Sequence, residues 1–318
     1  MSILHGLGTP DIRAAVRQAH DVAVREALAV FESAASRGRR GHGGADVIDG
    51  DGFVAAAFAH RTSRAGDPHL HTHVVIANLV HGPDGRWTAL DARPLYHWSK
   101  TVGYLYEAEL RHQLTRTVGV EWRTVRRGIA DVAEVPMQVV DEFSTRRHEI
   151  EAHLAENGFD SARSAQLAAY ATRRMKDHTA TPESLVDTWQ RRASELGFDC
   201  EQVCDRLNAG TLTLRWTGLV HLTPMFEHLA GPDGLTKTRS TFGRREVIQG
   251  ICDRLPIGAP VADICEWADL FIDSEHCTRL AGTKSAVIRT SDGRTVSART
   301  DERRFSTPDM LTTERRLI

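Results

Sequence analysis

Phe58-Ala59-His60-Arg61-Thr62-Ser63-Arg64-Ala65-Gly66-Asp67-Pro68-His69-Leu70-His71-Thr72-His73-Val74-Val75-Ile76-Ala77-Asn78 is the stretch of sequence that decides the fold around it. It reads as two strands joined by a turn at Gly66-Asp67-Pro68, a common reversal signal. Side chains alternate between the two faces of a strand, so His71 and His73 share one face. Antiparallel pairing across the turn brings His60 opposite either His71 or His73, depending on the length of the loop. Either register gathers three imidazoles on one face.

Three neutral imidazole nitrogens bind a divalent ion and leave some of its coordination positions open. That arrangement is typical of a catalytic rather than a structural metal site. We therefore predict that His60, His71 and His73 hold a divalent metal ion, with Mg²⁺, Mn²⁺ and Zn²⁺ as the candidates. His69 lies on the same face, as a fourth candidate or a rim residue. Histidines on strands are also often exposed or hydrogen-bonded without any metal, and that interpretation stays open.

The composition is that of a globular protein with no general affinity for nucleic acid. The 318 residues include 40 basic and 42 acidic side chains, for a formal net charge of −2, so any DNA contact must come from a local patch. The five cysteines all follow residue 199 without paired CxxC spacing, which favours reduced thiols. No apolar run approaches the roughly 18 residues of a membrane span, and the N-terminus has no signal-peptide pattern. We expect a cytoplasmic protein without membrane contacts.

The order of helix and strand patterns predicts an α+β fold. Helical spacing covers residues 10–36 and 94–118, with short strand patterns between them. We expect an antiparallel sheet that carries the three-histidine metal site and is covered by helices, followed by a small, mostly helical C-terminal domain. A loop-rich stretch that begins near residue 196 predicts a division into domains at 1–195 and 196–318. A further long helix is expected from Pro136 to Asn157.

Residues 36–44, with the sequence Ser-Arg-Gly-Arg-Arg-Gly-His-Gly-Gly, predict a flexible basic linker. Its arginines and glycines could contact phosphates, and an ordinary solvated loop is an equally good interpretation. The sequence contains no GxxxxGK[ST] motif, so no bound nucleotide is expected.

The histidine stretch resembles the three-histidine motif of conjugative DNA relaxases of the MobF class (TrwC/TraI-like), which belong to the HUH endonucleases. The resemblance rests on His60, on the ten residues from there to His71, and on Thr72-His73, with Arg64, Asp67-Pro68 and Asn78 around them. It extends to residues 2–10 and 104–110. Residues 306–311 and 314–317 resemble the segment that precedes the helicase in these proteins. Residues 1–195 would then be a relaxase-like domain, and 196–318 a linker and small domain.

The resemblance implies metal-dependent nicking of single-stranded DNA at a transfer origin. In this family the histidines hold a divalent metal that polarises the scissile phosphate, and a tyrosine near the N-terminus attacks it. Arg61 and Arg64, beside the metal face or at the hairpin tip, are predicted to contact flanking phosphates. Asp67 is interpreted as a turn residue rather than a base. Single-stranded DNA and other relaxosome or conjugation-coupling proteins are the expected partners.

The sequence departs from the family pattern at its start. It lacks the N-terminal tyrosine segment and the acidic residue that precede the part matching Ser2, so we expect a truncated relaxase with the metal half of its active site. Tyr96, Tyr104, Tyr106 and Tyr170 do not match the missing nucleophile, and Tyr104 and Tyr106 are expected to pack or to make hydrogen bonds. Two alternatives stay open, a non-catalytic DNA-binding remnant and a metal-dependent hydrolase that uses water.

Overall fold

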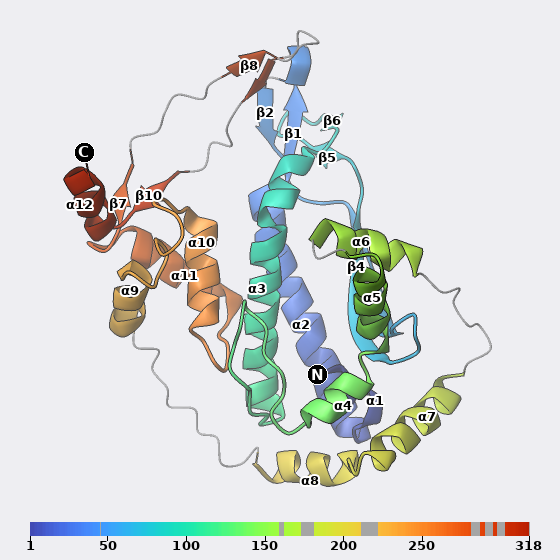
Figure 1. Cartoon of the computed structure of the whole chain (residues 1–318). Helices are drawn as coiled ribbons and strands as arrows, with labels where there is room; N and C mark the ends of the chain where they lie inside the picture. Colours follow the sequence, from blue (N-terminus) through green and yellow to red (C-terminus); the bar gives the residue numbers. More distant parts are fainter. Residues whose placement is uncertain are drawn as a thin grey trace.

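Two long helices run through the centre of the molecule. The computed structural model describes residues 1–44, 46–158, 162–172, 181–210, 222–280, 287–289, 295–297 and 303–317. In it, α2 (Pro10–Ala35) and α3 (Ala92–Thr117) pack side by side (Figure 1). Pro10 occupies the first turn of α2, where its missing N–H is harmless. Asp91 caps α3 by accepting a hydrogen bond from the backbone N–H of Arg93, at 3.2 Å.

The described strands form separate two-stranded antiparallel sheets rather than the single sheet expected from the sequence. The pairs are β1 (Arg37–Arg40) with β2 (Asp46–Asp49), β3 (Ala55–Thr62) with β4 (Pro68–Ile76), β5 (Val80–His81) with β6 (Trp87–Thr88), β7 (Thr278–Arg279) with β10 (Phe305–Ser306), and β8 (Val287–Arg289) with β9 (Thr295–Ser297). The α+β class is confirmed. The histidine hairpin is β3–β4, and among the described strands these two pair with each other alone.

The prediction of a flexible linker at residues 36–44 was wrong. Residues 37–40 are β1, and the short 3-10 helix η1 (His42–Gly44) follows. Each arginine of β1 is paired with a carboxylate, Arg37 with Asp49 at 2.8 Å, Arg39 with Asp91 at 2.8 Å, and Arg40 with Asp84. These acidic partners lie 12 to 52 residues further along the chain, so the basic run by itself could not reveal them.

The helix expected from Pro136 to Asn157 is broken in two. The structure has α4 (Met137–Glu142) and α5 (Thr145–Glu156), followed by α6 (Ala162–Ala171). The break exposes the backbone N–H of Thr145, which donates to the carboxylate of Asp67 at 3.0 Å. Tertiary contact with the hairpin therefore accounts for an interruption that helical periodicity did not predict.

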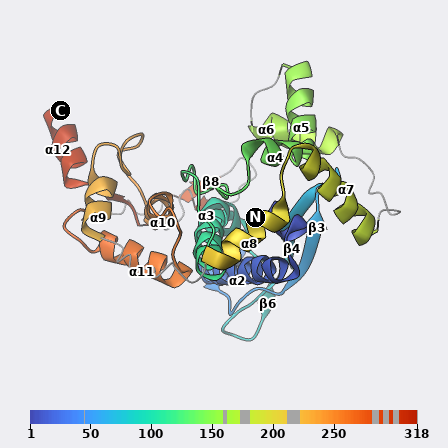
Figure 2. The same ribbon diagram turned by 90° about the horizontal axis from the view of Figure 1, so that it is seen from below.

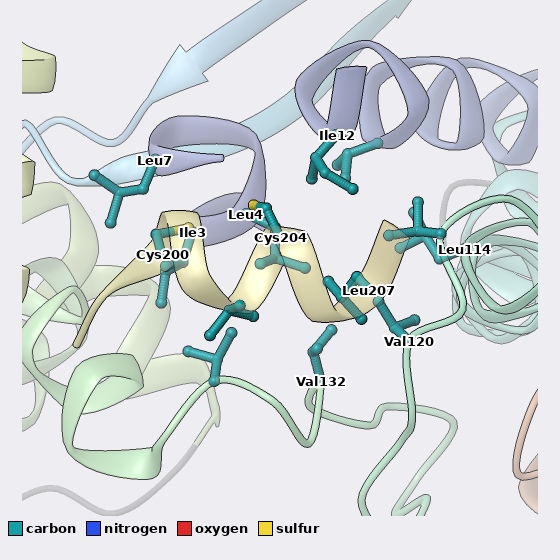
Figure 3. Close-up of a cluster of buried hydrophobic side chains, with 14 of the residues drawn as sticks. Ile3, Leu4, Leu7, Ile12, Leu114, Val120, Val132, Cys200, Cys204 and Leu207 are labelled. Atoms are coloured by element: carbon teal, nitrogen blue, oxygen red, sulfur yellow. The ribbon is translucent and has the colours of Figure 1, made fainter. Parts of the chain in front are cut away.

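A first cluster of buried side chains joins distant parts of the chain. Figure 3 shows Ile3, Leu4 and Leu7 of α1 (Ser2–Leu7) packed against Cys200, Cys204 and Leu207 of α8 (Cys200–Gly210), with Leu114 of α3 beside them. The same cluster includes Leu70 of β4 and Trp189 of α7 (Pro182–Glu195). One face of the histidine hairpin therefore rests on a packed core.

A second cluster lies on the other side of α3. It is built from α9 (Leu222–Ala230), α10 (Arg244–Asp253), α11 (Val261–Ile272) and β10, and α12 (Pro308–Leu317) follows. Arg111 of α3 is fully buried and donates to the carbonyls of Gly128, at 2.6 Å, and Cys252, at 3.2 Å. Seen from below, these C-terminal helices and the β3–β4 hairpin lie on opposite sides of α2 and α3 (Figure 2).

The division at residue 195 stays a prediction, and α8, which follows it, packs into the first cluster. All five cysteines are free thiols, as expected. Burial raises the pKa of Cys200 to about 12 and that of Cys277 to about 11. Among the described helices, none is both long and apolar enough to cross a membrane.

Candidate metal centre

The hairpin has the first of the two registers allowed by the sequence. His60 pairs with His71, and Phe58 pairs with His73. The register shifts between His60 and Thr62, which absorbs the odd residue of the connecting loop. Gly66 turns the chain with a φ of +85°, a conformation that glycine adopts without steric cost. Residues directly opposite in an antiparallel pair share a face, so the three histidines stand together.

The three rings are nearly equidistant. The ring centroid of His60 lies 5.2 Å from that of His71 and 5.0 Å from that of His73, and the last two are 5.0 Å apart. Three imidazoles bound tetrahedrally to one ion, with metal–nitrogen distances of about 2.0 Å, place their ring centres about 5 Å apart. The spacing therefore fits a shared divalent ion.

A hydrogen bond selects the nitrogen of His71 that can bind a metal. Its Nδ1 lies 2.9 Å from the carbonyl oxygen of His69, an acceptor, so Nδ1 carries the proton. The lone pair is then on Nε2, and a ring held by its other nitrogen is the usual state of a metal-binding histidine. Burial, aided by the nearby His71, lowers the pKa of His69, so that neighbouring ring is neutral near pH 7.

The arrangement falls short of a closed coordination site. Within the described residues, no group of three or more His, Cys, Asp or Glu side chains is placed so that it could hold a metal ion. The His60 and His71 rings lie almost parallel, with an interplanar angle of 20°. Ring rotation would be needed to direct three nitrogens at one point. The type of donor and the spacing of the rings thus fit a divalent ion, whereas the orientation of the rings does not.

The two faces of the hairpin have opposite surroundings. On the histidine face, Phe58 and Val75 are 53% and 59% exposed. On the other face, Leu70 is buried and its backbone N–H donates to Oγ of Ser2 at 3.1 Å. Thr72 on that same face lies 2.8 Å from Nε2 of His20 in α2. Helices support the hairpin from one side, and the histidines face solvent on the other.

Asp67 has a larger role than the turn residue predicted from the sequence. Its side chain is only 2% exposed and accepts hydrogen bonds from the N–H and Oγ1 of Thr145, at 3.0 and 3.1 Å. A third bond, of 3.0 Å, comes from Nη1 of Arg192 in α7. Trp189, one turn earlier, donates from Nε1 to the carbonyl of Gly66 at 2.8 Å. Helices α5 and α7 thus hold the hairpin tip. The Asp67 carboxylate is buried and occupied by these hydrogen bonds, so it is not available as a base, in line with the prediction.

Sequence reasoning missed Arg192, Trp189, Thr145 and His20. The first three lie 78 to 125 residues from their hairpin partners, so no local pattern indicates them. His20 left a signal, because it follows Val16 by four residues on the apolar stripe of α2, where both neighbours Val16 and Ala23 are buried. A polar residue at such a position is expected to have a buried hydrogen-bond partner.

Arg61 and Arg64, the predicted phosphate contacts, are both exposed on the hairpin. Within the described part of the chain, neither guanidinium forms an ion pair. Arg61 contributes to lowering the pKa of His5 in α1 to about 4, although burial is the larger cause. Arg61 therefore lies towards the helices, and Arg64 lies in the loop at the tip.

Tyr104 and Tyr106 of α3 do not lie on the histidine face of the hairpin. Tyr104 is buried in the second cluster, and Tyr106 Oη lies 2.9 Å from Nδ1 of His20, beneath the hairpin. The expectation that both residues pack or make hydrogen bonds is confirmed. Tyr96, at the start of α3, is 79% exposed, and the side chain of Tyr170 lies outside the described residues.

This geometry agrees with a match to a known family. The family model described as TrwC relaxase matches residues 1–196. The chain belongs to the TrwC relaxase family. The resemblance of the histidine motif to MobF-type conjugative relaxases is thereby confirmed.

Relatives and solved structures agree with the family. Multifunctional conjugation protein TraI of Escherichia coli is 34% identical over 190 residues, covering 57% of this chain and 10% of TraI. TraI of Escherichia coli strain K12 is 31% identical over 208 residues, covering 61% of this chain and 11% of that protein. The chain therefore spans about a tenth of the length of these TraI relatives.

Two structures of the conjugative relaxase TrwC are similar over the same region. One is a copper-bound complex with oriT DNA, and the other contains a 27-mer DNA comprising the recognition hairpin and the cleavage site. Each has a TM-score of 0.56 and 33% identity, and covers 63% of this chain; the chain covers 68% and 71% of the respective TrwC chains.

Proposed function

We propose that this chain supplies the metal-binding and DNA-contacting part of a conjugative relaxase, which nicks single-stranded DNA at a transfer origin by metal-dependent transesterification. The observation that carries the proposal is the set of three imidazoles, 5.0 to 5.2 Å apart, on the exposed face of the β3–β4 hairpin. Relatives named for conjugation, and TrwC structures with oriT DNA in metal-bound and metal-free forms, support it.

His60, His71 and His73 would hold the metal ion. A divalent ion bound there would polarise a phosphate oxygen and neutralise its charge. The chain's own contribution is to present neutral nitrogen donors, and the bond from Nδ1 of His71 to the carbonyl of His69 keeps Nε2 available. The candidate ions remain Mg²⁺, Mn²⁺ and Zn²⁺, because imidazole ligands alone do not select among them.

The hairpin surface suits a single DNA strand. Arg61, on the side of the hairpin towards the helices, and Arg64, in the loop at its tip, offer exposed positive charge. Phe58, opposite His73, exposes 53% of its surface, and exposed aromatic rings stack on nucleobases irrespective of sequence. A hollow of about 520 Å³ beside the tip is lined by apolar side chains, such as Phe143 and Ile150, and by the charged side chains of Arg146, Arg147 and Glu151. We propose Arg61 and Arg64 as phosphate contacts and Phe58 as a stacking platform.

The attacking group is not assigned to this chain. Of its described tyrosine side chains, Tyr104 is buried, Tyr106 lies on the helix side of the hairpin, and Tyr96 is exposed at the start of α3. We expect no tyrosyl–DNA adduct when the 318-residue chain is incubated with single-stranded DNA and Mn²⁺. An adduct that survives denaturing electrophoresis would contradict this expectation and restore full nicking activity to the chain.

Titration of the purified chain with Mn²⁺ and Zn²⁺ tests the metal site. The double variant His71→Ala/His73→Ala should lose most of the affinity, because one imidazole cannot replace three. His42→Ala/His97→Ala, which removes two exposed histidines elsewhere, should bind as the parent does. Equal affinity in the parent and the His71→Ala/His73→Ala variant would sink the proposed metal site.

The same preparations separate the alternatives. Single-stranded DNA binding that is unchanged by a chelator would favour a non-catalytic DNA-binding remnant. Steady turnover of phosphodiesters with water would favour a metal-dependent hydrolase, which membership of the relaxase family disfavours. A cytoplasmic location and partners from the relaxosome or the conjugation-coupling machinery remain part of the proposal.

A further inference from the structure

A chain of partly buried hydrogen bonds, centred on the buried His20, ends directly beneath the candidate ligands. Nδ1 of His20 lies 2.9 Å from Oη of Tyr106, and Nε2 of His20 lies 2.8 Å from Oγ1 of Thr72. His20 is 2% exposed, and its ring meets that of Tyr106 edge to face, with centroids 5.7 Å apart. The three residues come from α2, α3 and β4, so the chain links the central helix pair to the hairpin.

The position of Thr72 gives this link its significance. Thr72 stands between His71 and His73 in β4, and its side chain points to the opposite face, towards the helices. Its backbone therefore connects the two candidate ligands. A hydrogen bond that fixes Oγ1 of Thr72 limits the twist and displacement of the strand at this residue. The positions of both neighbouring imidazoles depend on that same stretch of backbone.

An apolar side chain at position 20 could pack α2 against β4 without any hydrogen bond. His20 occupies the apolar stripe of α2, and burying an imidazole there costs free energy unless both nitrogens find partners. Both do, and the two hydroxyls can each donate or accept, so either neutral tautomer of His20 is satisfied. Val at position 72 would have nearly the same shape as Thr, so shape alone does not account for the hydroxyl.

We propose that Thr72 and His20 are positioning residues of the metal centre, which act by holding β4 so that His71 and His73 present their nitrogens to one ion. This inference rests on the proposed function, because it assigns a role towards the same metal site. Neither residue touches the ion. Groups that hydrogen-bond a ligand ring change metal affinity by about 10- to 100-fold when they are removed, and a link that acts through the backbone is expected to lie at the lower end of that range.

The test compares two threonines whose hydroxyls each make a partly buried hydrogen bond of 2.8 Å. Thr72→Val removes the bond to His20, and Thr101→Val removes a bond of 2.8 Å from Nε2 of Gln249, in the part of the molecule that packs against α10. Both variants should lose similar amounts of thermal stability. Only Thr72→Val should bind Mn²⁺ about tenfold more weakly than the parent, measured by titration well below the unfolding temperature.

Rescue separates positioning from packing. Thr72→Ser keeps the hydroxyl and loses a methyl group, so it should restore most of the Mn²⁺ affinity, while Thr72→Ala should not. Affinity of Thr72→Val equal to that of Thr101→Val would overturn the inference, as would failure of Thr72→Ser to bind better than Thr72→Ala. The proposed function fails by a different result, namely the parent chain binding Mn²⁺ no better than His71→Ala/His73→Ala.

Discussion

The β3–β4 hairpin and the neighbouring β1–β2 hairpin both carry arginines beside a glycine-containing turn. In the sequence both look like phosphate contacts. In the structure, Arg37, Arg39 and Arg40 of β1 are each paired with a carboxylate, whereas Arg61 and Arg64 of the histidine hairpin are exposed and form no ion pair within the described residues. A run of basic residues in a sequence therefore does not show how much of its positive charge is free to bind phosphate, because carboxylates from distant parts of the chain can pair with it.

The strongest test of this comparison concerns an arginine that holds the hairpin. Arg192 and Arg40 are similarly exposed, at 24% and 23%, but their partners differ, because Asp67 is 2% exposed and Asp84 is 44% exposed. Arg192→Leu should destabilise the protein by about 3 kcal/mol, because it leaves a buried carboxylate without its cation.

Its matched control is Arg40→Leu, which should cost less than about 1 kcal/mol, as surface pairs do. Urea unfolding of both variants measures the difference. Equal losses of stability would mean that the burial of Asp67 does not govern the strength of its ion pair with Arg192. The ion pair would then not be what holds the hairpin tip in place.

A second prediction compares exposed aromatic side chains in the two regions. Phe58→Ala should weaken binding of a single-stranded oligonucleotide by about 1–3 kcal/mol, the usual contribution of base stacking. Trp87→Ala, in β6 next to β1, removes a ring that is 58% exposed and should leave the affinity unchanged. Phe58→Tyr should behave as the parent, and Phe58→Leu as Phe58→Ala. Fluorescence anisotropy is suitable, and a Phe58→Leu variant with full affinity would rule out stacking.

A third prediction addresses the arginines themselves. If Arg61 and Arg64 each contact a phosphate, Arg61→Ala/Arg64→Ala should reduce the slope of log affinity against log salt by about 1.4, since each contact to a single strand contributes about 0.7. Arg39→Ala/Arg40→Ala should leave the slope close to that of the parent. A larger change of slope in Arg39→Ala/Arg40→Ala than in Arg61→Ala/Arg64→Ala would mean that the β1 arginines, and not those of the histidine hairpin, contact the DNA.

The smallest predicted effect is on the pH dependence of stability, to which one histidine from each region contributes with opposite sign. Burial, with Arg61 and other nearby cations, lowers the pKa of His5 beneath the histidine hairpin to about 4, whereas the carboxylate of Asp51 raises the pKa of His81 in β5. Below about pH 6.5 the unfolded chain takes up a proton at His5 that the folded chain does not, so this group lowers stability as pH falls. His81 acts in the opposite sense, since its stabilising contribution is present below that pH and is lost as pH rises through its raised pKa.

Burial also lowers the pKa of His20 and of His112. The three histidines His5, His20 and His112 therefore lower stability on acidification, whereas His81 raises it. The urea midpoint should fall between pH 7 and pH 5. His5→Gln should flatten this dependence and His81→Gln should steepen it. A midpoint that rises on acidification in the parent would contradict the assignment of His5.

Much of the fold follows from local pattern. The hairpin, its two possible registers, the two central helices and the reduced cysteines are all encoded in short-range spacing. The choice of register was not, because it depends on the irregularity after His60 and on the contacts of the loop from Ser63 to Asp67. The division of the strands into separate pairs, the break before Thr145 and the roles of Arg192 and His20 depend on tertiary contacts, which single-sequence periodicity does not contain.

One small feature of the site bears on how it could have evolved. The carbonyl that fixes the proton on Nδ1 of His71 belongs to His69, two residues earlier in the same strand. Many metal sites depend on a carboxylate from another element for this purpose. Here the tautomer of one proposed ligand is set within a single short peptide segment. Insertions or rearrangements elsewhere in the protein can therefore change what surrounds the hairpin without changing which nitrogen of His71 is available.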